Sequence, residues 1–189
     1  MQLGYTTSQA WTDHVLSHFD QFLLDHAACE KKASSMAMSM VSHYPDKPEL
    51  VQAMIDLSIE ELSHYRDVFR IINQRGLQLA ADEKDPYIQQ FRQHIRQGPE
   101  AYLLDRLLIA AIVEARGHER FGLIAAALEP GPLKQFYTAI THSESRHFQL
   151  FVDLAERYIK PAVVASRLNE LLDAEAAIVA TLPIRAALH

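Results

Sequence analysis

The chain has little cysteine, few glycines and no long apolar run, and each shortage narrows what the protein can be. Cys29 is the one cysteine among 189 residues, which excludes an intrachain disulfide and a cysteine-based zinc or iron–sulfur site. No stretch approaches the roughly 18 uninterrupted apolar residues of a membrane span. The N-terminus also lacks the basic-then-apolar pattern of a signal peptide. We therefore expect a cytoplasmic protein with no membrane partner.

A surplus of positive charge is missing as well. The formal net charge is −6, whereas nucleic-acid-binding domains usually carry a basic surplus. A local basic patch is still compatible with that total. Hydrophobic residues make up 49% of the chain and only 6 residues are glycine, while Ala, Leu, Glu, Gln and Arg are common. This composition favours helix, and the length suits one domain with a sizeable core.

Amphipathic periodicity predicts the architecture. Apolar residues recur at alternating three- and four-residue spacing, which is typical of helices with one side in a core. The predicted bundle helices cover residues 17–43, 48–75, 100–128 and 133–159, and an extra C-terminal helix covers 162–181. The links after the first and third helices are short, whereas a long crossover with a short amphipathic piece joins the second to the third. We expect an all-α, ferritin-like four-helix bundle forming a single domain over residues 1–189.

A carboxylate interrupts the apolar stripe of each of the four bundle helices, and two of these helices carry a histidine one turn later. The six residues are Glu30, Glu61, His64, Glu114, Glu144 and His147. An unpaired ionised carboxylate is strongly disfavoured in a core and must be paired or bind a metal ion. The stripes contain no Lys or Arg that would balance these charges. A pair of metal cations is therefore the most economical partner.

The six residues also repeat in order and spacing. Glu61 follows Glu30 by 31 residues and Glu144 follows Glu114 by 30, and each second glutamate begins a Glu-x-x-His motif. Residues three apart share a helix face, so the motif can offer an oxygen and a nitrogen to one centre. Two such motifs and two further glutamates make the ligand set of di-iron and di-manganese bundles. The sequence predicts a dinuclear site with pseudo-twofold symmetry, in which carboxylates favour iron or manganese over copper or zinc.

Simpler interpretations hold for the residues around this set. A single Glu-x-x-His motif usually marks a solvated helix face. Two such motifs in register on core stripes instead favour metal binding. His26, one turn before Glu30, is more simply interpreted as a satisfied core histidine than as a seventh ligand. Cys29 is most simply a small buried residue. The residues expected at the surface or around the ligands are His118, Glu119 and Glu156.

The sequence around these positions resembles that of one protein family. The runs that carry the resemblance are Glu30-Lys31-Lys32-Ala33, Glu60-Glu61-Leu62-Ser63-His64, Asp105-Arg106-Leu107-Leu108, Val113-Glu114-Ala115-Arg116, Glu119-Arg120-Phe121 and Ser143-Glu144-Ser145-Arg146-His147-Phe148. They are similar to the tRNA 2-methylthio-isopentenyladenosine hydroxylases, from about Trp11 to Tyr158. The metal motifs alone occur in many di-iron proteins, whereas Glu-Ala-Arg-x-x-Glu-Arg-Phe and Ser-Glu-x-Arg-His-Phe are more specific.

The resemblance implies an oxygen-dependent di-iron monooxygenase. Its substrate would be the isopentenyl group of the modified adenosine next to the tRNA anticodon. The same six residues would bind two iron ions, with Glu61 and Glu144 bridging them, and dioxygen would be the co-substrate. The chain has no flavin or iron–sulfur signature, so electrons should come from a separate reductase.

A tRNA partner requires local positive charge on this acidic chain. The target base lies in a single-stranded loop, and phosphate contacts need only a local patch. The basic residues within about two turns of a predicted ligand are Lys31, Lys32, Arg66, Arg70, Arg116, Arg120 and Arg146. We predict that some of them line the entrance to the metal site. A solvated face or a structural ion pair is an equally good interpretation of each one.

Two other functions fit the same ligand set. A di-iron hydroxylase of a small or lipidic, quinone-like substrate would share the short chain and the ligands. Such enzymes usually carry an apolar membrane-docking surface, whereas the predicted last helix is amphipathic but acidic. A non-enzymatic iron-binding or storage protein would need a cage-forming oligomer and many irons per chain. The sequence leaves the oligomeric state open.

Overall fold

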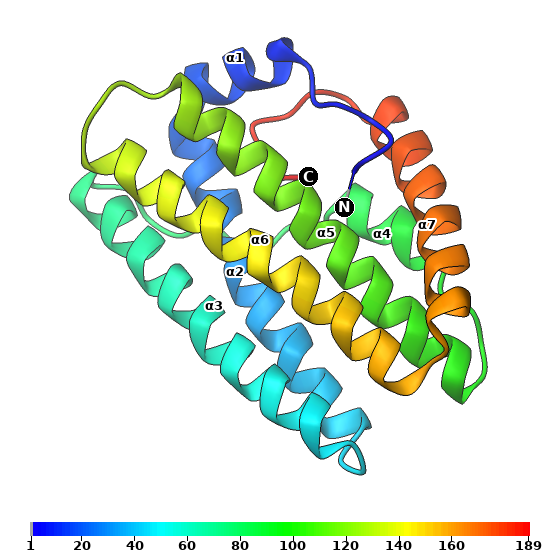
Figure 1. Ribbon diagram of the computed structural model, residues 1–189. Helices are drawn as coiled ribbons and strands as arrows, with labels where there is room; N and C mark the ends of the chain where they lie inside the picture. Colours follow the sequence, from blue (N-terminus) through cyan, green and yellow to red (C-terminus); the bar gives the residue numbers. More distant parts are fainter. Residues whose placement is uncertain (1) are drawn as a thin grey trace. The chain divides into compact units, whose positions relative to one another are not determined.

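A computed structural model describes residues 2–189, and all regular structure within them is helical (Figure 1). The helices are α1 (Gln9–Ser17), α2 (Phe19–His43), α3 (Pro48–Gln74), α4 (Pro86–Arg92), α5 (Pro99–Ala127), α6 (Pro132–Tyr158) and α7 (Pro161–Thr181). The predicted bundle helices and the extra C-terminal helix correspond to α2, α3, α5, α6 and α7, with ends that agree within two residues. The all-α prediction is confirmed.

The start of the chain differs from the sequence prediction in one detail. The first bundle helix was expected to begin at residue 17. The structure instead ends α1 at Ser17 and begins α2 at Phe19, because His18 has non-helical angles of φ −127° and ψ 41°. The rings of His14 and His18 lie 4.3 Å apart across this break.

Proline and glycine set most of the helix boundaries. The first residues of α3 to α7 are Pro48, Pro86, Pro99, Pro132 and Pro161. Proline suits this position because its fixed φ is helical and its missing N–H would have no partner there. Gly76, after α3, has φ 70°, and Gly98, before α5, has φ 100°. Both conformations are accessible to glycine because it has no Cβ.

The chain divides into two compact units. The first unit contains residues 13–83 and 185–188, and thus α2 and α3. The second contains the chain up to Thr12, residues 84–184 and His189, and thus α4 to α7. The single-domain organisation stays a prediction.

In the first unit, α2 and α3 pack along each other as a hairpin joined by residues 44–47. Their apolar stripes are buried, as shown by Phe22 and Met40 on α2 and by Met54 on α3. Small polar residues hold the middle of the hairpin together, because the hydroxyls of Ser34 and Ser58 are 2.7 Å apart. The stripes carry Glu30 and Glu61 into this interior.

In the second unit, α5 and α6 form a hairpin of the same kind, and α7 packs against α4, α5 and α6. Asp105 of α5 is fully buried and holds two arginines. Its Oδ2 accepts from the backbone N–H of Arg96 at 2.8 Å, and its Oδ1 accepts from Nη2 of Arg96 and Nε of Arg167, each at 2.9 Å. Asp105 thereby ties the segment after α4 and the start of α7 to α5.

Asp105→Asn is expected to lower the free energy of unfolding at pH 7 by about 2 kcal/mol, because charge-assisted hydrogen bonds are lost. Burial alone would raise the pKa of Asp105, but the hydrogen bonds from Arg96 and Arg167 outweigh it and lower the pKa below its ordinary value. A carboxylate whose pKa is lowered on folding stabilises the protein fully above its unfolded pKa of about 3.9. This contribution disappears as pH falls through the folded-state pKa.

Urea unfolding followed by circular dichroism from pH 7 to pH 3 checks this prediction. The difference between wild type and Asp105→Asn should shrink below about pH 4. Asp173→Asn is the matched control, because it removes an exposed carboxylate of α7. An equal loss of stability in both variants would contradict the role given to Asp105.

Candidate metal centre

The hairpin of α2 and α3 brings together Glu30, Glu61 and His64. Each of the three offers a ligand atom within 4.8 Å of those of the others. Nδ1 of His64 lies 3.4 Å from Oε2 of Glu61 and 3.7 Å from Oε2 of Glu30. Both glutamates are buried, whereas His64 is partly exposed. We call these three residues the first trio.

His26 joins the first trio as a further polar group. Its Nε2 lies 2.6 Å from Oε1 of Glu30, one helical turn later on α2, and its side chain is fully buried. From the sequence, His26 could be interpreted as a satisfied core histidine or, less simply, as a seventh ligand. In the structure this histidine is satisfied by a predicted metal ligand, and its four-residue spacing from Glu30 was the available signal.

Negative charge is partly compensated within the first trio itself. Burial alone would raise the pKa of Glu30, but hydrogen bonds with His26 and His64 outweigh it and hold the pKa well below its usual range. Burial would likewise lower the pKa of His64, but Glu30 and Glu61 outweigh it and raise the pKa to about 10. A proton on His64 therefore compensates one of the two carboxylate charges, and a metal cation would replace this proton, since only the neutral imidazole is a ligand.

The hairpin of α5 and α6 brings together Glu114, Glu144 and His147, which we call the second trio. Their ligand atoms also lie within 4.8 Å of one another. Nδ1 of His147 is 3.7 Å from Oε2 of Glu114 and 3.8 Å from Oε2 of Glu144. All three residues are buried. Each hairpin thus gathers the three ligands that the sequence predicts for it.

The chemistry of both trios fits a divalent cation. Each trio supplies two carboxylates and one imidazole, a hard-to-borderline donor set suited to iron or manganese. Buried carboxylates require compensation by opposite charge, and a cation held by one trio would provide it. The predicted ligands therefore lie as two similar trios, one for each hairpin.

Three polar residues that the sequence analysis places outside the ligand set have partners of their own. Nδ1 of His118 lies 2.8 Å from the backbone oxygen of Thr141, and Glu119 accepts a hydrogen bond from the N–H of Thr7 at 2.9 Å. Sγ of Cys29 lies 3.7 Å from a carboxylate oxygen of Asp25. Their partners agree with roles outside the ligand set.

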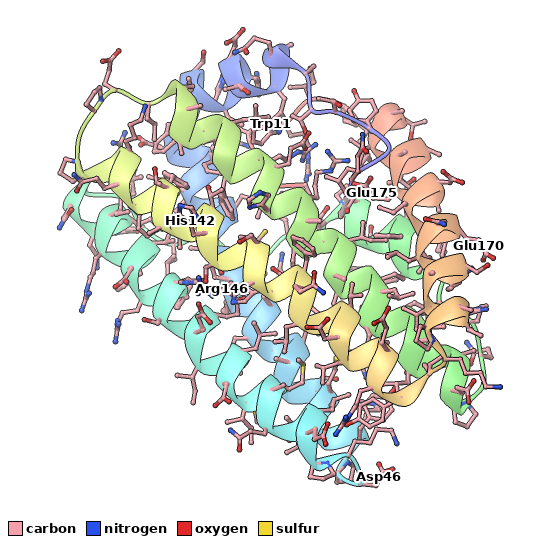
Figure 2. The ribbon with its side chains drawn as sticks, in the orientation of Figure 1. Trp11, Asp46, His142, Arg146, Glu170 and Glu175 are labelled. Carbon is pink, nitrogen blue, oxygen red and sulfur yellow. The ribbon has the colours of Figure 1, made fainter. Side chains whose placement is uncertain are left out.

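Two of the seven basic residues lie in the interior of the second unit. Arg116 is fully buried, and its Nε and Nη2 donate to Glu175 of α7 at 2.8 and 2.9 Å. Arg120 is also buried, with its guanidinium 4.8 Å from the ring centre of Trp11. Figure 2 shows Glu175 on the side of α7 nearer α5, whereas Glu170 points outward. Buried guanidinium groups do not present to phosphates, so we do not retain Arg116 and Arg120 as RNA contacts.

The exposed basic residues differ in their surroundings. Nζ of Lys31 lies 2.8 Å from Oδ1 of Asp82, and Nζ of Lys32 donates to the carbonyl of Glu83 at 2.9 Å. Both lysines therefore hold the connector that precedes α4. Arg146 is exposed on α6, where its Nη2 lies 3.1 Å from Oγ of Ser143 (Figure 2).

Arg66 and Arg70 lie on the outer side of α3. Nε of Arg66 is 3.6 Å and Nη1 of Arg70 is 2.8 Å from Oδ1 of Asp67. Arg66 follows His64 by two residues, which corresponds to about 200° around a helix. Its side chain therefore leaves α3 away from the first trio.

Comparison with known proteins identifies the family of this chain. The sequence model of the family described as tRNA-(MS2IO6A)-hydroxylase (MiaE) matches residues 2–189. The chain belongs to the MiaE family. The family suggested by the residues around the ligands is thereby confirmed.

Two similar proteins share one name. The tRNA 2-(methylsulfanyl)-N(6)-isopentenyladenosine(37) hydroxylase of Pseudomonas putida is 34% identical over 163 residues, which cover 86% of this chain and 79% of the relative. The hydroxylase of that name from Salmonella typhimurium is 29% identical over 152 residues, covering 80% of this chain and 55% of the relative. The match thus spans about half the length of the Salmonella protein.

A solved structure extends the likeness to the whole fold. Protein 43 from Synechococcus, described as having aldehyde deformylating oxygenase activity, matches with a TM-score of 0.93 and 33% identity, covering 100% of this chain and 96% of that one. This MiaE-family chain accordingly has the all-α, ferritin-like fold predicted from its sequence. Among the helices of residues 2–189, none has a long enough apolar stretch to span a membrane.

Proposed function

We propose that the protein is a tRNA hydroxylase that oxidises the isopentenyl group of 2-methylthio-isopentenyladenosine next to the anticodon. The observation that carries the proposal is a family match over residues 2–189 in a chain whose two hairpins each hold a carboxylate–imidazole trio. The names of the Pseudomonas and Salmonella relatives supply the substrate.

In this proposal the two trios share one di-iron centre. Support comes from the repeated order of ligands in the two hairpins and from the match between four carboxylates, two imidazoles and a dinuclear site. Glu61 and Glu144, which begin the two Glu-x-x-His motifs, would be the bridging ligands. A single trio would leave its metal with only three protein ligands, whereas bridging carboxylates raise that number for both ions.

A bound, reduced iron pair would supply the redox chemistry that activates dioxygen. Overall, one oxygen atom becomes the new hydroxyl, and the other leaves as water after uptake of two electrons and two protons. The protein's own residues hold the metal ions, orient the prenyl group and exclude water from the buried carboxylates. The electrons would come from a separate reductase, and the reaction would take place on cytoplasmic tRNA.

We infer that tRNA phosphates contact exposed basic side chains. The candidates that have exposed or partly exposed side chains are Lys31, Lys32, Arg66, Arg70 and Arg146. Lys31 and Lys32 directly follow the ligand Glu30 along α2. Because phosphate contacts release counterions, the KM for tRNA should rise steeply with salt concentration.

A turnover experiment tests the proposal. Iron-loaded, reduced protein is mixed with oxygen and tRNA that carries the prenylated adenosine, and the digested nucleosides are analysed by mass spectrometry. We expect a nucleoside heavier by one oxygen atom, and none from tRNA that lacks the prenyl group. If an iron-loaded sample with a competent electron donor forms no such product, the tRNA hypothesis is wrong. Repeating the assay at rising salt measures the phosphate contribution.

The similarity to Protein 43 favours a second candidate, an oxygenase of a small apolar substrate such as an aldehyde. That protein is 33% identical to this chain and is described as having aldehyde deformylating oxygenase activity. The same reduced sample, given aldehydes in place of tRNA, should release formate if this candidate is correct. Iron storage predicts instead many irons per chain within a large oligomeric shell, whereas both oxygenase hypotheses predict two irons.

A further inference from the structure

The two hairpins repeat their ligands, but they differ one turn before the first glutamate of each. Glu30 of α2 and Glu114 of α5 hold equivalent places in the repeated pattern. The residue four positions earlier is His26 on α2 and Ala110 on α5. An imidazole therefore stands beside one of the two glutamates at a position where the other hairpin has a methyl group.

The contact between His26 and Glu30 has a defined direction. Nε2 of His26 lies 2.6 Å from Oε1 of Glu30, and both side chains are buried. An ionised carboxylate can only accept hydrogen bonds, so Nε2 of His26 carries the hydrogen and donates it. The ring packs beside Phe22, whose ring centre is 6.0 Å away. The donor is thus held in place inside the hairpin.

This hydrogen bond distinguishes the two oxygens of Glu30. Oε1 faces His26, whereas Oε2 lies 3.7 Å from Nδ1 of His64 in the first trio. The carboxylate plane is therefore fixed before any metal binds, with Oε2 on the side of the other ligands. A ligand that is already oriented loses less conformational freedom when it binds a metal.

We propose that His26 is a positioning residue that makes the two metal positions unequal, so that the first trio binds its ion more tightly than the second. The inference rests on the proposed dinuclear centre and adds to it an order of metal binding. Outer partners of metal ligands typically contribute a factor of about 10–100 in metal affinity. An effect of that size on the tighter step alone is the expected signature.

Anaerobic titration of the metal-free protein with Co²⁺ tests the inference without requiring turnover. Visible absorption follows ligand-bound cobalt, and equilibrium dialysis counts the ions for each chain. Wild type should bind two ions in two resolved steps. His26→Leu should weaken the first step about 10–100-fold and leave the second nearly unchanged. His26→Gln should recover much of the loss, because its amide N–H can donate to Glu30.

Ser34→Ala is the matched control. Ser34 lies one turn after Glu30 on α2, is buried, and bonds to Ser58 rather than to Glu30. This variant should keep both cobalt steps at their wild-type affinities, and circular dichroism should show all variants folded. A control that weakened the first step as much as His26→Leu would assign the effect to packing and overturn the inference.

Other outcomes separate the inference from the proposed function. If His26→Leu keeps both steps unchanged, weakens both equally, or loses one ion entirely, His26 is not a positioning residue for one metal. If wild type itself fails to bind two ions, the dinuclear centre is wrong, and the inference is wrong with it. Two ions in wild type and unaltered steps in His26→Leu would overturn the inference alone.

Discussion

Replacing Glu61 by alanine is expected to remove at least one of the two metal ions and to lower hydroxylation by more than about 100-fold, since even an outer partner of a metal ligand contributes about 10–100-fold. Glu61 is almost fully buried, its carboxylate lies in the first trio, and in the proposed centre it bridges both ions. Alanine at this position would withdraw one ligand from each ion. Iron analysis of the purified variant and the nucleoside assay measure the two effects.

Glu60→Ala is a close control for this experiment. Glu60 is the neighbouring glutamate on α3, but its side chain is 36% exposed and lies off the apolar stripe, with Oε1 4.0 Å from Nε2 of His64. We expect this variant to keep two irons and most of its activity. A Glu61→Ala protein with two irons and full activity would overturn the ligand assignment. A Glu60→Ala protein with the larger loss would transfer the role to Glu60.

The sequence was informative at several residues that conflict with their local pattern. Proline at helix starts and glycine after α3 and before α5 mark the boundaries, because their backbone preferences are intrinsic. Glutamates on apolar stripes predicted the two trios, because burial of a carboxylate needs a specific compensation. Each of these arguments uses the pattern of a single helix. It therefore needs no knowledge of how distant segments of the chain pack.

Contacts between distant segments could not be predicted in this way. Arg116 follows Glu114 by two residues, about 200° around the helix, so its side chain leaves α5 on another side. The sequence does not reveal that α7 covers that side. One signal was present: Glu175 lies between Leu171 and Ile178 on the apolar stripe of α7, at spacings of four and three residues. It is a buried carboxylate like the predicted metal ligands, but an arginine compensates it.

This buried pair leads to the largest expected effect on stability. Arg116→Met should lower the free energy of unfolding by about 3–5 kcal/mol, because it leaves Glu175 as an uncompensated buried charge. For a chain of this size the loss corresponds to about 6–20 °C in Tm. Thermal and urea unfolding of the metal-free protein measure it. Arg146→Met, which removes an exposed arginine of α6, should change stability by less than about 0.5 kcal/mol.

The double variant Arg116→Met/Glu175→Leu separates the ion pair from its surroundings. Removing both charges also removes the buried-charge penalty, so its destabilisation should be smaller than the sum of the single losses by about 2 kcal/mol or more. Some loss should persist, because the hydroxyl of Tyr87 bonds to Glu175 at 3.2 Å and Glu119 also pairs with Arg116. Burial, followed by the charge of Glu175, raises the pKa of Tyr87, so its phenol stays a neutral donor. An Arg116→Met protein with unchanged Tm and a raised KM for tRNA would instead make Arg116 an RNA contact.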